Sequence, residues 1–235
     1  MNTERHIATA FDRDLEGVQA LVLRMGGLVE AALADAASAL EARDDAMAER
    51  VRESDTAIDA LEEQINTECV RLIALRAPTA SDLRTVMTVM KISASLERCG
   101  DYAKNLAKRS IVLSNMHTIE GAAGAIRRMS RQVGLMLKDA LDAFISRDVA
   151  LAQSVRMLDR DVDQMYTGLF REFLTHMMED PRNITACMHL HFIAKNIERV
   201  GDHATTIAEQ VIYLATGALP TDPRPKSESV IAGDV

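Results

Sequence analysis

Residues 190–214, LHFIAKNIERVGDHATTIAEQVIYL, show most clearly which kind of fold the chain adopts. Their apolar residues recur at alternating spacings of three and four positions: Leu190, Ile193, Ile197, Val200, Ala204, Ile207, Val211 and Leu214. This period places the apolar side chains on one stripe of an α-helix. The segment is therefore predicted to be a helix that buries this stripe against neighbouring helices.

Similar stripes occur along the rest of the chain. Residues 89–106 repeat the pattern closely, residues 51–72 and 155–169 carry comparable stripes, and residues 8–42 and 119–145 fit helices less strictly. Short polar or proline-containing breaks separate these segments at 43–45, 78–79, 114–115, 146–148 and 180–181. The last helix is expected to end at Gly217, because glycine is the usual residue just after a helix. The pattern predicts six helices with short connections.

The composition supports an all-α fold. The chain has 235 residues, of which 48% are hydrophobic and only 3% aromatic, so alanine, leucine and methionine supply most of the apolar mass. These three are strong helix formers. Five prolines and eleven glycines are too few for the turns of a many-stranded β protein.

The charge and the termini exclude several classes of protein. A net charge of −8 would repel nucleic acid and anionic lipid, so neither is an expected partner. No uninterrupted apolar run approaches the roughly 20 residues of a membrane span, so no membrane insertion is expected. The N-terminus lacks the features of a signal peptide, and three widely spaced cysteines indicate neither disulfides nor a thiolate zinc site. These observations predict a cytoplasmic protein.

The two halves of the chain resemble each other. Residues 39–59 match 143–163 at an offset of 104, and residues 82–109 match 183–210 at an offset of 101. Two constant offsets indicate a repeated unit of three helices, which is enough for one bundle core. We therefore predict a first three-helix bundle in residues 1–115, a second in 116–217 and a disordered tail in 218–235.

The repeat also preserves acidic residues, which packing alone does not require. Glu-Arg-x-Gly-Asp occurs at residues 97–101 and again at 198–202. On a helical projection the two acids of each motif lie one turn apart and well away from the apolar stripe, so they are expected on the outer face. Like charges at this spacing destabilise a helix by a few tenths of a kcal/mol. A bound cation would relieve this repulsion.

A second group of acids lies on the preceding helix of each half. Asp55, Asp59 and Glu62 share one face, with Glu63 just beyond, and Asp159 and Asp163 are the equivalents of the first two. If neighbouring helices present these rows side by side, several carboxylates converge, and such all-oxygen clusters suit Mg²⁺, Ca²⁺, Mn²⁺ or iron. The predicted metal ligands are Asp55, Asp59, Glu62, Glu97, Asp101, Asp159, Asp163, Glu198 and Asp202.

Two other interpretations of the acidic residues are possible: a helical scaffold and a metalloenzyme. An acidic row on a helix is usually solvated surface, so the chain could be a helical scaffold whose acids only keep it soluble. A multinuclear metalloenzyme would use the same carboxylates for catalysis. Against an enzyme, no candidate nucleophile or base accompanies the acids, and no GxxxxGK[ST], GxGxxG or GxSxG motif occurs. Arg98 and Arg199 are expected to pair with neighbouring acids.

Together these motifs resemble the PhoU family of regulators that accompany Pst-type phosphate transporters. The resemblance rests on both Glu-Arg-x-Gly-Asp motifs, the two Asp-x-x-x-Asp pairs, and the runs MGGLVE at 25–30 and APTASDLR at 77–84. It implies two tandem three-helix bundles, often dimeric, with divalent metal or iron clusters on the acidic surface. Tyr166 and Thr167 replace Glu62 and Glu63 in the second half, which therefore has fewer candidate ligands.

The same resemblance implies a role without catalysis. Proteins of this family link a PstB-type transporter ATPase to a PhoR-type sensor histidine kinase when phosphate is ample. They thereby keep phosphate-starvation genes (the Pho regulon) repressed and restrain phosphate uptake. A cytoplasmic adaptor, as a homodimer, is the function expected from the sequence.

Overall fold

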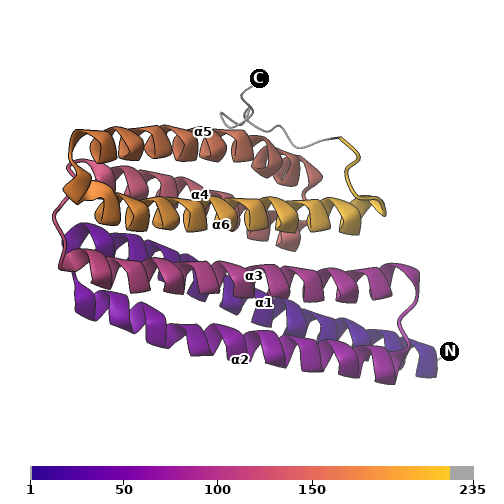
Figure 1. The fold of residues 1–235 in the computed structure, drawn as a ribbon. Helices are drawn as coiled ribbons and strands as arrows, with labels where there is room; N and C mark the ends of the chain where they lie inside the picture. Colours follow the sequence, from indigo (N-terminus) through magenta and orange to yellow (C-terminus); the bar gives the residue numbers. More distant parts are fainter. Residues whose placement is uncertain (1, 223–235) are drawn as a thin grey trace.

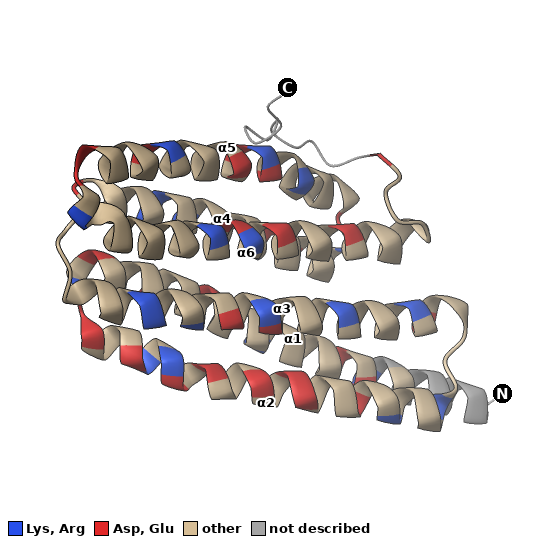
Figure 2. Ribbon diagram, viewed as in Figure 1, with Lys and Arg blue, Asp and Glu red and all other residues tan. Residues whose placement is uncertain are grey.

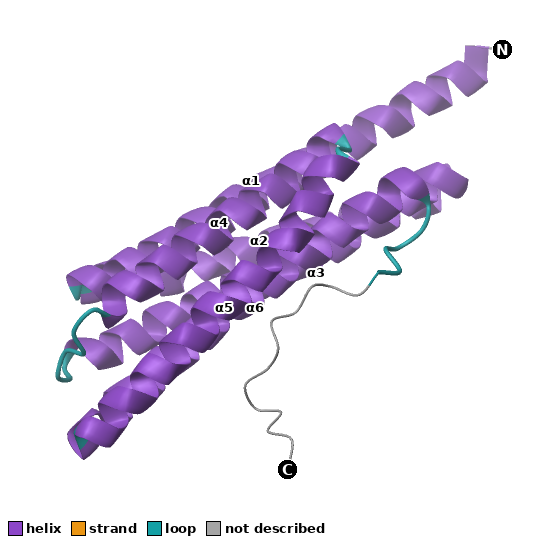
Figure 3. Ribbon diagram, turned by 90° about the horizontal axis from the view of Figure 1, so that it is seen from above, coloured by secondary structure: helices purple, strands orange, loops and turns teal. Residues whose placement is uncertain are grey.

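A computed structural model of the chain describes residues 2–222, with side chains for residue 11 and residues 13–222. Within that range it contains six α-helices and no strands, as predicted. They are α1 (Asn2–Ala42), α2 (Asp45–Arg76), α3 (Ala80–Ser114), α4 (Ala122–Ser146), α5 (Val149–Glu179) and α6 (Ile184–Thr216), with a 3₁₀ turn at Pro181–Asn183 before α6. Figure 3 shows that the long helices run along one common axis.

The helices form two groups of three that pack side by side. In Figure 1, α1, α2 and α3 form the lower group and α4, α5 and α6 the upper one, and each helix contacts both others of its group. Two further contacts, α3 with α6 and α1 with α4, join the groups. The buried apolar residues of both groups belong to one continuous core. The assignment of each bundle to a separate domain stays a prediction.

The connections between helices have the same local structure in both halves. Arg43 and Arg147 have φ values of 54° and 53°, which end α1 and α4 in the left-handed conformation. The aspartate that follows each arginine caps the next helix: Asp44 Oδ1 accepts a hydrogen bond from the Met47 amide at 2.9 Å, and Asp148 Oδ1 accepts one from Ala150 at 2.8 Å. The repeated Arg-Asp pair is thus a structural turn.

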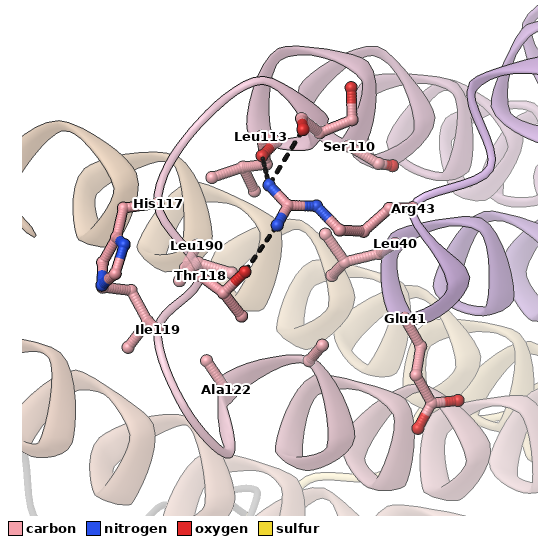
Figure 4. Close-up of a pocket in the computed structure, with 12 residues that line it drawn as sticks. Leu40, Glu41, Arg43, Ser110, Leu113, His117, Thr118, Ile119, Ala122 and Leu190 are labelled. Carbon is pink, nitrogen blue, oxygen red and sulfur yellow. Dashed lines mark hydrogen bonds between the residues drawn. The ribbon is translucent and has the colours of Figure 1, made fainter.

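Arg43 also ties the end of α1 to the end of α3 and to the α3–α4 connection. Its guanidinium donates to the carbonyl oxygens of Leu113 and Ser114, at 2.7 and 2.9 Å, and to the Thr118 hydroxyl in the α3–α4 connection. Figure 4 shows this guanidinium above a small cavity lined by Leu40, Leu113, Ile119, Ala122 and Leu190. The end of α1 is thereby fixed to the segment that leads into α4.

The first helix is apolar along most of its length. Residues Arg13–Ala42 are long and apolar enough to cross a membrane on length and composition alone, a criterion that core helices of soluble proteins also meet. No uninterrupted apolar run marks this segment in the sequence, because scattered charged residues divide it. In this fold Val22, Met25 and Val29 of the helix are fully buried in the core.

The tail predicted over residues 218–235 lies partly outside the described range, which ends at Asp222. Gly217 ends α6 with a φ of 84°, as expected from the sequence. After it, the Asp222 carbonyl accepts a hydrogen bond of 2.9 Å from Arg156 of α5. The first residues of the predicted tail therefore contact the second bundle.

Candidate acidic sites

Five acids gather where α2 packs against α3, and we call them the first acidic set: Asp55, Asp59, Glu62, Glu97 and Asp101. Gly100 permits this close packing. A Cβ atom at Gly100 would lie 3.0 Å from Ile58 Cδ1 and 3.5 Å from Asp55 Oδ1, so a larger residue would require the Ile58 side chain to shift. The glycine of the repeated motif therefore positions α3 directly over the acids of α2. Figure 2 shows further acidic residues along α2.

Asp55 is the buried member of the first acidic set. Only 4% of its side chain is exposed, and Lys104 of α3 donates a hydrogen bond from Nζ to Asp55 Oδ2. This hydrogen bond raises the pKa of Lys104 above its ordinary value. A buried carboxylate requires such a partner, because removing its charge from water is costly. Asp55 and Lys104 thus form an ion pair at the base of the set.

The outer members of the first acidic set repel one another. Desolvation raises the pKa of Glu97, and the negative charge of Asp101 raises it further. Desolvation also raises the pKa of Asp59, with an added contribution from Asp55. Arg98 offsets part of this repulsion, since its guanidinium lies 3.6 Å from Glu97 and 3.8 Å from Asp101. The pairing expected for Arg98 is therefore confirmed.

The second acidic set consists of the equivalent residues of α5 and α6: Asp159, Asp163, Glu198 and Asp202. Asp159 is buried like Asp55, and Asp163 and Asp202 are half-buried. Gly201 again lies at the helix contact, but more loosely: a Cβ atom there would be 3.4 Å from Val162 Cγ1 and 3.9 Å from Asp159 Oδ1. The frame of the first set is therefore repeated.

The second acidic set carries its own cation. Lys195 donates a 2.7 Å hydrogen bond from Nζ to Glu198 Oε1, and Lys195 also lies 5.0 Å above the ring centre of Tyr166, the residue that replaces Glu62. Only 12% of the Glu198 side chain is exposed. Desolvation raises its pKa even though Lys195 acts in the opposite direction.

The acids of both Glu-Arg-x-Gly-Asp motifs were expected on the outer face, and this expectation is wrong for Glu198. Asp55 and Asp159, the predicted ligands on the neighbouring helices, are buried as well. In the first motif Glu97 and Asp101 keep 27% and 36% of their side chains exposed. The single-helix projection assumed one buried direction, whereas α6 contacts α3, α4 and α5. A helix with three neighbours buries a wider arc than its apolar stripe indicates.

Metal binding by the two acidic sets stays a prediction. Among the residues whose side chains the structure describes, no three His, Cys, Asp or Glu side chains form a group that could hold a metal ion. The first acidic set has the donor chemistry for a hard cation, since all its candidate donor atoms are carboxylate oxygens, and Asp59 and Glu97 have raised pKa values. In the second set Lys195 already neutralises Glu198. The first set is the better candidate.

The sequence did not identify the two lysines that pair with acids of these sets, Lys104 and Lys195. Lys195 lies three residues before Glu198, a spacing at which helical side chains meet, so this pair had a local signal. Lys104 had none, because Asp55 is 49 residues away along the chain.

Arg199 lies 5.8 Å from the centre of the Tyr102 ring, and that ring contacts His203 across the α3–α6 seam.

Comparison with known proteins identifies the family. A family model described as the PhoU domain matches residues 22–110 and 126–211. The chain belongs to the PhoU family. A phosphate-specific transport system accessory protein PhoU homolog of Rhizobium meliloti is 47% identical over 95% of this chain and 94% of its own length. The homolog of Caulobacter vibrioides is 45% identical over 94% and 96% of the two chains.

Solved structures agree with this family assignment. The crystal structure of PhoU from Pseudomonas aeruginosa superposes with a TM-score of 0.86 at 43% identity, covering 88% of this chain and all of that one. The phosphate transport system regulatory protein PhoU from Streptococcus pneumoniae gives a TM-score of 0.83 at 32% identity, over 89% and 99% of the two chains. The two matches of the family model correspond to the two halves recognised as a repeat.

Proposed function

We propose that this protein is a non-enzymatic, cytoplasmic regulator of phosphate homeostasis. One observation carries the proposal: the chain matches named accessory proteins of phosphate-specific transport systems over nearly its whole length. In this role it would bind a PstB-type transporter ATPase and a PhoR-type sensor histidine kinase. Under ample phosphate it would hold the kinase in the state that keeps phosphate-starvation genes repressed and uptake low.

The shape of the molecule suits an adaptor. Long helices present extended surfaces on several sides, and contacts of modest area on such surfaces would let partners dock reversibly. We include a homodimer in the proposal, which light scattering of the purified protein tests directly. A mass corresponding to one chain at micromolar concentration would contradict the dimer and leave the adaptor role intact.

We further propose that the first acidic set binds a divalent cation or an iron cluster. Asp59, Glu62, Glu97 and Asp101 would supply the ligands after small side-chain rotations, while Asp55 remains paired with Lys104. The bound cation would supply positive charge that relieves the repulsion between these carboxylates. It would thereby fix the relative position of α2 and α3, which is a structural role.

A deletion strain tests the regulatory proposal. Without the protein, a phosphate-starvation promoter fused to a reporter should be active in phosphate-rich medium, and expression of the intact chain should silence it again. A reporter that stays silent in the deletion strain would contradict the regulatory role. The metalloenzyme hypothesis would then become the leading alternative, and hydrolase assays with Mn²⁺-loaded protein would test it.

A further inference from the structure

A groove lined by residues of α1 and α4 lies along the contact between these two helices. Figure 1 shows these helices behind α3 and α6. The groove consists of two adjoining hollows of about 330 and 410 Å³ that share Arg127 and Arg131. None of the acids of the two acidic sets lines it. It is therefore a feature separate from the acidic sites.

The groove is positively charged, although the chain as a whole carries a net charge of −8. Four cations of α4 line it, against two carboxylates of α1, Glu30 and Glu41: Arg127, Arg128, Arg131 and Lys138. Arg127 is paired with Glu41, and Lys138 is paired with Asp142. Within the described part of the chain, Arg128 and Arg131 form no ion pair or hydrogen bond, and both are exposed. Such a surface attracts an anionic partner.

The floor of the groove is apolar and made of small residues. Ala34 and Ala37 of α1 and Gly134 of α4 line it, and Leu135 keeps 48% of its surface exposed. From Gly124 to Lys138 the helix rises about 21 Å, at 1.5 Å per residue. A single phosphate ion would fill a small part of this length. A helix of about four turns would fill it, with apolar residues on the floor and acids against the arginines.

We propose that the α1–α4 groove docks an acidic amphipathic α-helix of a signalling partner. The inference rests on the proposed function, which requires the chain to contact a kinase and a transporter ATPase. It assigns one of these contacts to the α1–α4 groove and specifies that the partner contributes an acidic helix there. The complementary charges would act mainly on the association rate and on its dependence on salt.

The test reverses the charge of Arg128 and Arg131, which have no partner among the described residues. The Arg128→Glu, Arg131→Glu double variant would be compared with an Arg50→Glu, Arg171→Glu double variant, which makes the same change of charge on exposed positions of α2 and α5. Titration calorimetry would measure binding to the purified ATPase and to the cytoplasmic region of the kinase, at low and high NaCl. Circular dichroism would confirm that both variants keep the helical fold.

We expect the groove variant to bind one partner at least tenfold more weakly, with much of the salt dependence lost, and the control variant to bind it normally. An Ala34→Cys variant then identifies the occupant by cross-linking, because the three native cysteines are buried. A cross-link to an acidic helix of that partner would support the inference. A cross-link to a basic or an extended segment would overturn it.

Other outcomes also decide the question. Unchanged affinity of the groove variant for both partners would overturn the inference while leaving the proposed function in place. A changed oligomeric state in light scattering would show that a second copy of the chain occupies the groove. Binding of inorganic phosphate or pyrophosphate that the variant loses would show a small-anion site instead. If the intact chain binds neither partner, the proposed function and this inference both fail.

Discussion

The first and second acidic sets share a frame but differ in how their charge is neutralised. In each set a buried aspartate lies beneath a motif glycine, and two acids of the motif lie above it. In the first set the lysine reaches the buried acid from the neighbouring helix, which leaves the outer carboxylates to repel one another. In the second set Lys195 pairs with the motif glutamate itself.

This difference shows that a sequence repeat preserves backbone positions more strictly than it preserves chemistry. Lys104 corresponds to Thr205 in the second half, and Lys195 corresponds to Ala94 in the first. Tyr166 in place of Glu62 removes one more carboxylate and provides a ring for Lys195. Desolvation and repulsion between carboxylates raise pKa values in both sets. In the second set Lys195 opposes the repulsion by a direct hydrogen bond to the motif glutamate, whereas in the first set the lysine bonds the buried Asp55 instead.

The largest effect is expected from removing the lysine of the first set. Lys104→Met should destabilise the protein by about 2 kcal/mol, because it leaves the buried Asp55 carboxylate without its partner. The raised pKa of Lys104 means that its contribution is complete below 10.5 and is lost only when the pH rises through the folded-state pKa. Urea unfolding at pH 7 therefore measures the whole effect.

Lys108→Met is the matched control, since Lys108 is exposed on the same helix. Its effect should stay within about 0.5 kcal/mol, as for most surface substitutions. Equal stabilities of the Lys104 and Lys108 variants would contradict the assignment of an ion pair at the base of the first set.

Metal binding should separate the two sets next. Glu97→Gln with Asp101→Asn should weaken Mn²⁺ binding at least tenfold, because it removes two of the oxygens that carry the unrelieved charge. Glu198→Gln with Asp202→Asn should change it less than threefold. Both pairs of substitutions keep side-chain size, so calorimetry compares charge alone. Equal losses from the two pairs would show that the sets bind metal alike, and no binding by the intact chain would remove the metal proposal.

Much of the architecture could be predicted from the sequence. Periodicity located the six helices, and the offset repeat indicated two groups of three, because both depend on patterns along one chain segment. Burial of individual acids could not be predicted in the same way. Whether Glu198 or Glu97 is covered depends on the tertiary packing around each motif, because α3 and α6 each contact three other helices. Lys104 was missed for the same reason.

The pH dependence of stability should reveal the buried charge of the second set. Because the pKa of Glu198 is raised in the folded protein, its charged form costs stability above that pKa, and the cost disappears as the pH falls below the ordinary value of 4.5. Glu198→Gln should therefore raise the melting temperature at pH 7 by about 2 °C, with the difference shrinking towards pH 4. Glu172→Gln, at an exposed position of α5, should show no such trend. A lower melting temperature at pH 7 would mean that the Lys195 pair outweighs the cost of burial.

The smallest effect concerns the two arginines that end α1 and α4. Both hold a left-handed conformation that costs a non-glycine residue about 1 kcal/mol, so glycine should relieve strain at either position. The greater freedom of glycine in the unfolded chain offsets part of that gain. Arg147→Gly should therefore stabilise the protein by a few tenths of a kcal/mol. Arg43→Gly should destabilise it, because it also removes the hydrogen bonds to Leu113, Ser114 and Thr118. Urea midpoints of the two variants give the comparison directly, and shifts of the same sign would contradict the role of Arg43 in holding the end of α1 to the α3–α4 connection.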